Sequence, residues 1–490
     1  MHKHLRTALA TATAAALTGG LLSFASTAAT AADSTAVPFA DFNNDGKADV
    51  AFSASEAYVK GKKGAGQLVV LYGTSTGVTA AKRSTISQDT SGTPGGVEAG
   101  DAFGSDTAYA DFNHDGYDDL AVSSPGEDVG NDVDGGSVSI LWGSASGITG
   151  KGIAIPDPAQ SGHDNWGRFL AAGDFDGDGK ADLAVASNNS TIYVYKGGFT
   201  TSGTPGGRYT IKPPVYSGEG IGALNLTAGD VNGDGRTDLV VDGYETSTQY
   251  GWNRNYWIPG TASGLSVASA KTLKPGIITA IGDIDADGYG DIVSGAEWDS
   301  TTDDGTTIPD SAKGGKVWVT YGTASGPGSA TGITQDTAGV PGSSETADNF
   351  GYELDLGDIN GDSYLDLVIG SPGETLNGVA HTGMLTVLYG SANGLDTITG
   401  AQAFGQNDPS VPGNDEKNDN FGLDVKLDDV TGDGKADLIA GSGENSGDGS
   451  ITYLPSNGTK ITATGARSIW PADAGVSTTG TPFFGANFAD

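Results

Sequence analysis

Apolar residues in this chain occur in short runs separated by polar turns, and many of the runs alternate apolar with polar positions. An alternation of period two is typical of a β-strand with one buried face. The chain shows no long amphipathic helical pattern, and it contains 80 glycines, many of them between the runs. The pattern therefore predicts an all-β protein. Its clearest examples are residues 66–73 (GQLVVLYG), 136–143 (GSVSILWG), 315–322 (GKVWVTYG) and 383–390 (GMLTVLYG).

The predicted strands recur in a fixed order. Four units open with an aromatic-glycine pair that begins a short strand and is followed by a loop rich in aspartate; the pairs are Phe103-Gly104, Trp166-Gly167, Phe350-Gly351 and Phe421-Gly422. A second apolar run then ends in a turn such as residues 371–374 (SPGE), and the alternating segment and a weaker fourth strand complete the unit. Four strands per unit are typical of one blade of a β-propeller.

The aspartate-rich loop occurs seven times, at intervals of 53 to 75 residues. Repeats of this length are typical of solenoids and propellers. The first unit lacks an aromatic-glycine strand of its own, whereas the chain ends with Phe484-Gly485 and with residues 488–490 (FAD), which match residues 39–41 (FAD). We therefore predict a seven-bladed β-propeller of four-stranded antiparallel blades, closed by pairing of the N- and C-terminal segments.

The aromatic-glycine pair, the aspartate-rich loop and the SPGE turn together resemble the FG-GAP repeats of integrin α-chain propellers and of many bacterial secreted proteins. The resemblance covers nearly all of the chain after residue 31. It implies a calcium-binding propeller that acts as an extracellular recognition or adhesion module. It does not identify the ligand, because one fold hosts many unrelated functions.

The loops themselves also indicate calcium. Positions one, three and five are Asp or Asn in every loop except the last. Position six is Gly in every loop except the sixth. The calcium loop of an EF-hand opens with the same pattern, because alternating oxygen-bearing side chains wrap around one hard cation. We expect the side chains at positions one, three, five and nine and the backbone carbonyl at position seven to bind one Ca²⁺ per blade, up to seven in total.

The candidate ligands are, loop by loop, Asp41, Asn43, Asp45, Lys47 and Asp49; Asp111, Asn113, Asp115, Tyr117 and Asp119; Asp174, Asp176, Asp178, Lys180 and Asp182; Asp230, Asn232, Asp234, Arg236 and Asp238; Asp283, Asp285, Asp287, Tyr289 and Asp291; Asp358, Asn360, Asp362, Tyr364 and Asp366; and Asp429, Thr431, Asp433, Lys435 and Asp437. Ser363 replaces the glycine of position six, which strains a turn of positive φ, and Thr431 is a poorer ligand at position three. We expect these two sites to be the weaker ones.

An alternative interpretation is that the loops are ordinary Asx turns whose side chains bind only their own backbone. One such loop would favour this interpretation. Seven loops favour calcium, because three carboxylates in one nine-residue turn repel one another unless a cation lies between them.

Composition narrows the class of protein. The formal net charge is −36, which argues against nucleic acid as a partner. Cysteine is absent, so disulfides do not stabilise the fold.

Residues 1–31 contain Lys3 and Arg6, an apolar stretch and a small-residue cleavage site, which predicts a secretory signal peptide. Residues 32–490 form the predicted propeller. No stretch is apolar enough to span a membrane, so we predict a secreted, extracellular protein.

Catalytic motifs are weak. Residues 73–77 (GTSTG) fit the nucleophile-elbow pattern, but related turns carry Ala145, Ala262, Ala324 and Ala392 where this one has Ser75, which indicates a turn motif. After residue 31 only His114, His163 and His381 remain, and none has zinc-site spacing. We expect no catalytic residue and no cofactor besides calcium. A polysaccharide hydrolase or lyase that uses two carboxylates is the alternative from another class.

Blade topology places the aspartate-rich loops on one face and the long variable loops, such as residues 125–135 and 297–313, on the other. Recognition residues commonly lie on such loops. We expect an extracellular protein or a glycan to bind there, as in a lectin-type propeller or a subunit of a secreted assembly. Trp252, Trp298 and Trp470 are the candidates for stacking on a sugar, although tryptophans also fill gaps between blades.

Overall fold

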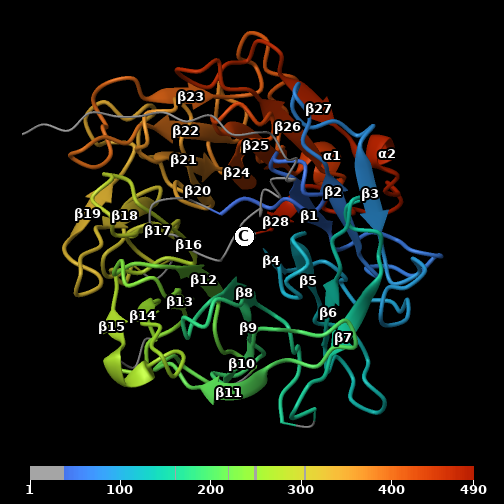
Figure 1. Cartoon of the computed structure of the whole chain (residues 1–490). Helices are drawn as coiled ribbons and strands as arrows, with labels where there is room; N and C mark the ends of the chain where they lie inside the picture. Colours follow the sequence, from blue (N-terminus) through green and yellow to red (C-terminus); the bar gives the residue numbers. More distant parts are fainter. Residues whose placement is uncertain (1–37, 161, 219, 248–250, 303–304, 490) are drawn as a thin grey trace, which may run out of the picture.

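The computed structural model describes residues 38–489 with gaps at 161, 219, 248–250 and 303–304. The predicted signal peptide, residues 1–31, lies outside the described residues. In the described part, the chain forms seven four-stranded antiparallel sheets arranged as blades around a central axis (Figure 1). The predicted all-β, seven-bladed propeller is confirmed.

In each blade the strands follow one another from the axis outwards (Figure 1). Blades one to four contain β28 (Ala486–Phe488), β1 (Val50–Ala54), β2 (Gln67–Leu71) and β3 (Arg83–Ile86); β4 (Thr107–Ala110), β5 (Asp119–Ser124), β6 (Ser137–Leu141) and β7 (Gly152–Ile155); β8 (Leu170–Gly173), β9 (Asp182–Val185), β10 (Ile192–Lys196) and β11 (Gly207–Ile211); and β12 (Asn225–Gly229), β13 (Asp238–Asp242), β14 (Tyr256–Ile258) and β15 (Lys271–Thr272).

Blades five to seven contain β16 (Ile278–Gly282), β17 (Asp291–Ala296), β18 (Lys316–Thr320) and β19 (Ala330–Ile333); β20 (Leu354–Gly357), β21 (Asp366–Ser371), β22 (Met384–Leu388) and β23 (Gln402–Phe404); and β24 (Asp424–Asp428), β25 (Asp437–Ser442), β26 (Ser450–Leu454) and β27 (Arg467–Ile469). The helices in the described residues are short: α1 (Glu444–Gly447), α2 (Pro471–Ala474) and a 3₁₀ turn (Val267–Ser269). None of them has the length or apolar character needed to cross a bilayer.

The hydrophobic core lies between the blades. β5 and β17 are buried at every residue, because each second strand has a neighbouring blade on either side. One cluster joins Phe52 of blade one to Ile439 of blade seven, and another joins Ile140 of blade two to Leu183 of blade three. The chain therefore gains most of its apolar burial from contacts between sheets rather than within them.

The aromatic-glycine pairs lock successive blades together. Phe103 is 1% exposed, and a side chain on Gly66, at the start of β2, would lie 2.3 Å from the Phe103 backbone nitrogen. Gly449 approaches Phe484 in the same way, with the pair forming a parallel bridge. In blades one and seven, glycine at the start of the third strand thus lets the next aromatic-glycine segment pack directly on it.

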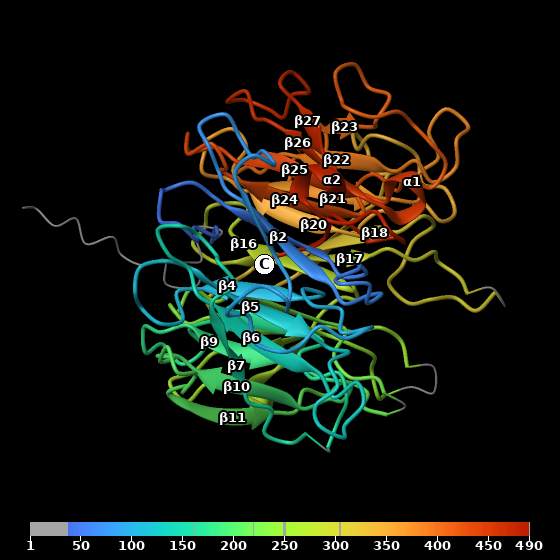
Figure 2. The same ribbon diagram turned by 90° about the vertical axis from the view of Figure 1, so that its right-hand side faces the viewer.

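The last strand, β28, is the innermost strand of blade one. It pairs antiparallel with β1, with Phe52 opposite Phe488, and the N–H of Ala489 donates to the carbonyl of Ala51 (2.9 Å). The ring of Phe484 packs edge-on against Phe52, with centroids 4.9 Å apart. Blade one therefore combines strands from the two ends of the described chain. Figure 2 shows the ring from the side, with loops projecting beyond the strands on both faces.

Candidate metal centres

In blades two to seven, the aspartate-rich loop connects the innermost strand to the second strand. In blade one the loop leads into β1, and the innermost strand is β28. The loop of blade two, for example, lies between β4 and β5. The turn after the third strand lies against the same loop, because the N–H of Gly143 donates to Asp119 Oδ1 (2.9 Å). The loops and these turns therefore share one face of the ring, as the topology predicts.

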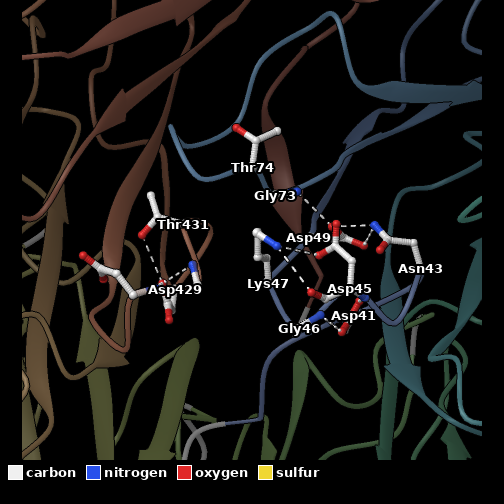
Figure 3. Close-up of polar contacts among 12 residues, drawn as sticks. Asp41, Asn43, Asp45, Gly46, Lys47, Asp49, Gly73, Thr74, Asp429 and Thr431 are labelled. Carbon is white, nitrogen blue, oxygen red and sulfur yellow. Dashed lines mark hydrogen bonds and ion pairs between the residues drawn. The ribbon is translucent and has the colours of Figure 1, made fainter.

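The side chain of position one organises the loop. In blade one, Asp41 Oδ1 accepts the N–H of Asp45 (3.0 Å) and Asp41 Oδ2 accepts that of Gly46 (2.8 Å), which curls the chain around the carboxylate (Figure 3). The same two bonds recur at the first position of the other six loops, which are those of Asp111, Asp174, Asp230, Asp283, Asp358 and Asp429.

Position six needs a left-handed backbone. Gly46 has φ 79°, and a Cβ built on it would meet nothing within 4 Å. Ser363 adopts φ 73° at the same position, and its N–H still donates to Asp358 Oδ2 (2.9 Å). The serine therefore fits sterically, and its cost is the unfavourable φ of a non-glycine residue.

Positions one, three and five converge where all three are aspartate. Carboxylate oxygens of Asp174, Asp176 and Asp178 lie within 4.8 Å of one another, and so do those of the Asp283, Asp285 and Asp287 set. These two acidic groups have the donor type and spacing to hold a metal ion.

Several oxygens of the loops are buried without a protein partner. Oδ1 of Asn113 and Oδ1 of Asp285, both at position three, are buried and have no hydrogen bond within the described residues. The same is true of Oδ2 of Asp119, Asp182 and Asp437 at position nine. A buried carboxylate oxygen without a donor is costly, so these atoms fit a hard cation as their missing partner.

The position-nine aspartates have a second role that the sequence did not indicate. They are at most 2% exposed, and one oxygen of each accepts the backbone N–H that opens the turn after the third strand. In blade one, Asp49 Oδ1 accepts from Gly73 (2.9 Å; Figure 3). In blade four, Asp238 Oδ2 also accepts the indole N–H of Trp257 (2.9 Å). These side chains thus tie three segments of a blade together.

Burial raises the pKa of every position-nine aspartate. Burial raises the pKa of Asp49 and Asp119 to about 8, and neighbouring loop carboxylates add to the rise. It raises the pKa to about 7 for the other five, which are Asp182, Asp238, Asp291, Asp366 and Asp437. A carboxyl whose pKa is higher in the folded state binds its proton more tightly there than in the unfolded chain. Ionising these groups without a counter-ion therefore costs stability as the pH rises from about 4 to about 8.

Loops of adjacent blades are joined through their backbones. The N–H of Ala48 donates to the carbonyl of Asp429 (3.0 Å), which places loop seven beside loop one (Figure 3). The equivalent bond links Thr237 to Asp174 (3.0 Å). In loop seven, the hydroxyl of Thr431 donates to Asp429 Oδ1 (3.2 Å), so the position-three side chain already contacts position one.

The opposite face carries a hollow lined by two of the predicted tryptophans. Trp252, from the β13–β14 loop, and Trp298, from the β17–β18 loop, line it together with Asn253, Tyr244 and residues 308–309. The indole N–H of Trp298 and the side-chain nitrogen of Asn253 are buried donors with no partner among the described residues. Trp470 lies elsewhere, at the start of α2 in blade seven.

Family models match the repeats at several places. An FG-GAP repeat is found at residues 35–71, 103–141 and 350–388, and an FG-GAP-like repeat at residues 174–241. These segments include the loops that begin at Asp41, Asp111, Asp174, Asp230 and Asp358.

Similar proteins belong to two groups. The phosphatidylinositol-glycan-specific phospholipase D of Rattus norvegicus is 32% identical over 148 residues, which are 30% of this chain and 17% of that protein. The Bos taurus counterpart is 27% identical over 237 residues, 48% of this chain and 27% of its own length. Integrin alpha pat-2 of Caenorhabditis elegans is 29% identical over 178 residues, 31% of this chain and 14% of the integrin.

The matches thus span less than a third of each relative. The repeats and the observed fold agree with one another: the chain contains FG-GAP repeats and forms a seven-bladed β-propeller.

Proposed function

We propose that this protein is a secreted, calcium-stabilised recognition module that binds an extracellular partner on the face opposite the aspartate-rich loops. The observation that carries the proposal is the separation of the two faces. One face is a repeated set of aspartate-rich loops, which serve the scaffold. The other carries the connections that differ most between blades, and diverse loops on a stiff scaffold are typical of a binding surface. The proposed signal peptide, residues 1–31, delivers the module to a calcium-rich environment.

The calcium part of the proposal rests on the loop oxygens. Positions one, three and five would supply side-chain ligands, and position nine would supply the orphaned Oδ2 where it has no other partner. Calcium suits such a site because it takes six to eight oxygens in a flexible geometry. When bound, the cation adds positive charge among the converging carboxylates. In loop three, Lys196 Nζ already lies 2.6 Å from Asp176 Oδ2 and Lys180 Nζ 3.8 Å from Asp178 Oδ2.

A protein partner is the leading candidate, since integrin alpha pat-2 is among the similar proteins. The test immobilises the propeller and captures proteins from cell-surface and secretome extracts in calcium. Replacing residues 375–381 on the variable face with a Gly-Ser linker should abolish capture. Replacing residues 391–393 (SAN) on the calcium face with Gly-Ser should leave it unchanged. Equal capture by both variants would refute the assignment of the binding face.

A glycan is the second candidate, favoured by the hollow at Trp252 and Trp298. An indole stacks on a sugar ring, and the unpartnered donors of Trp298 and Asn253 match sugar hydroxyl oxygens. We expect Trp298→Ala to weaken binding of an array-identified glycan roughly tenfold or more, as loss of an aromatic anchor does. Calcium content should not change. Trp470→Ala is the control that should bind normally, and calorimetry measures both. Equal affinity of the two variants would assign Trp298 to packing.

The module is proposed to act by binding, without catalysis. The similarity to phospholipases D is confined to the FG-GAP region, and Ser75 is exposed at the tip of a turn. In the equivalent turn of blade two, Ser144 Oγ donates to the Gly147 carbonyl (2.8 Å), so a hydrogen bond within the turn holds its shape.

We expect Ser75→Ala to leave any esterase activity of the purified protein unchanged, because related turns already carry alanine at this position. Hydrolysis of p-nitrophenyl acetate by the wild type and the variant measures this. A variant that folds normally but loses turnover would identify Ser75 as a nucleophile.

A further inference from the structure

A second acidic cluster lies on the face opposite the aspartate-rich loops. Glu345 and Asp348 belong to the connection from β19 to β20, and Glu374 follows β21. Carboxylate oxygens of the three side chains lie within 4.8 Å of one another. Asp348 and Glu374 are 2% and 5% exposed. Because connections between blades and between second and third strands share one face, the cluster joins blade five to blade six on the variable-loop side.

Gln335 supplies an independent observation. It is 2% exposed, and its side-chain nitrogen donates to Glu374 Oε2 (2.6 Å), so its carboxamide lies at the cluster. Its Oε1 is buried and has no hydrogen-bond partner among the described residues. An unpartnered buried carbonyl oxygen is costly, and a carboxamide oxygen is a ligand that calcium accepts readily.

Part of this arrangement recurs at two other junctions between blades, although of the three junctions only that of Glu345, Asp348 and Glu374 brings three carboxylates within 4.8 Å. In three short acidic segments, the backbone N–H of a glutamate donates a hydrogen bond to the side chain of an aspartate three residues later. The bonds run from Glu345 to Asp348 (2.6 Å), from Glu98 to Asp101 (2.6 Å) and from Glu416 to Asp419 (2.7 Å). At each junction the side-chain nitrogen of a glutamine donates to the glutamate that follows the second strand; the pairs are Gln335 with Glu374, Gln88 with Glu127 and Gln406 with Glu444. The Oε1 atoms of all three glutamines are buried and have no hydrogen-bond partner among the described residues.

The electrostatics of the cluster agree with this geometry. Burial raises the pKa of Glu374 to about 7, with Asp348 and Glu345 adding to the rise. Three carboxylates held this close repel one another unless positive charge lies between them.

We propose that Glu345, Asp348, Glu374 and Gln335 Oε1 bind a Ca²⁺ ion that joins blade five to blade six, at a site separate from the aspartate-rich loops. Carboxylates and a carboxamide oxygen form a hard, all-oxygen donor set. The ion would fix the connection between the blades to the turn after β21, and so hold the base of the variable loops.

Glu374→Gln is the direct test. The new carboxamide oxygen can still accept the hydrogen bond of Gln335, but the charge is lost. After equilibration with CaCl₂ and gel filtration, elemental analysis should find one bound calcium fewer per chain than in the wild type. Glu297→Gln is the matched control, because Glu297 is a half-buried carboxyl on the same face that accepts from Asn349 (3.0 Å) and lies outside the cluster. It should retain every ion.

An unchanged calcium content in folded Glu374→Gln would overturn the proposal. If that variant fails to fold, Glu345→Gln decides instead, because Glu345 is exposed and its loss leaves the buried hydrogen bonds intact. Asp178→Asn separates this site from the loop sites. Loss of an ion in Glu374→Gln but not in Asp178→Asn would support the site between blades while contradicting calcium in the third loop.

Discussion

Chelation by EDTA is expected to lower the melting temperature of this propeller by on the order of 10 °C. An ion that binds only the folded protein adds about 2.7 kcal/mol per site at a hundredfold excess over its Kd. Three such sites would contribute about 8 kcal/mol, comparable to the whole stability of a typical domain. The chain has no disulfide to replace that contribution. Calorimetric melting in calcium and in EDTA measures the difference, and identical curves would contradict a stabilising role for calcium.

One substitution tests the same idea at a single loop. Asp178 Oδ1 accepts the N–H of Lys180 (3.0 Å), and asparagine can keep this bond while it removes a charge. In calcium, Asp178→Asn should lower the melting temperature by about 3 °C, because one site is weakened. In EDTA it should be neutral or stabilising, since it relieves repulsion among the three loop carboxylates. The sign of the effect therefore depends on calcium.

Asp128→Asn is the control for this experiment. Asp128 also accepts a backbone N–H, that of Asp134 (3.0 Å), but it lies in the β5–β6 loop on the other face. Its substitution should have the same small effect with and without calcium. A calcium-dependent effect of Asp128→Asn would mean that overall charge, rather than the loop, controls the response.

Removal of residues 482–490 is expected to destabilise the protein severely. The deletion removes β28 and the buried Phe484, and it leaves β1 with an unpaired edge beside the axis. Phe484→Ala alone should cost about 3 to 5 kcal/mol, because the ring packs against Phe52 in a closed core.

Phe483 provides the neighbouring control, since it is 43% exposed, and Phe483→Ala should change the free energy of unfolding little. Urea unfolding of the deletion and of the two point variants measures the series. A deletion with wild-type stability would show that closure by β28 contributes nothing to the fold.

The repeat made the fold predictable from the sequence. The aromatic-glycine pairs, the loops and the alternating segments are local signals, and each marks the place of one strand. The sequence also predicts that the last strand completes the first blade, because the first unit lacks an aromatic-glycine strand and the chain ends with one. The close approach of Gly66 to Phe103 could not be predicted, because a glycine in a strand does not by itself indicate which neighbouring backbone packs against it.

The site was predictable only in part. Positions one, three and five lie within one turn, so their convergence follows from spacing. The bond from Asp49 to Gly73 depends on how a third strand returns beside the loop, which spacing does not reveal. The second acidic cluster was missed for a similar reason. Gln335 and Glu374 are 39 positions apart, and the segments that carry them look like variable polar loops until the blades are packed together.

The position of β28 also has a consequence for the order of folding. Blades two to seven are each continuous in the chain, so each can form its sheet as soon as its own residues are available. Blade one is completed only when the segment that contributes its innermost strand is present. Until then β1 has an unpaired strand edge, and the apolar face of Phe52 is exposed. Contacts between such distant segments form slowly. An intermediate with six complete blades and one open seam is therefore expected, and that seam is the place where two chains would most readily exchange strands or aggregate.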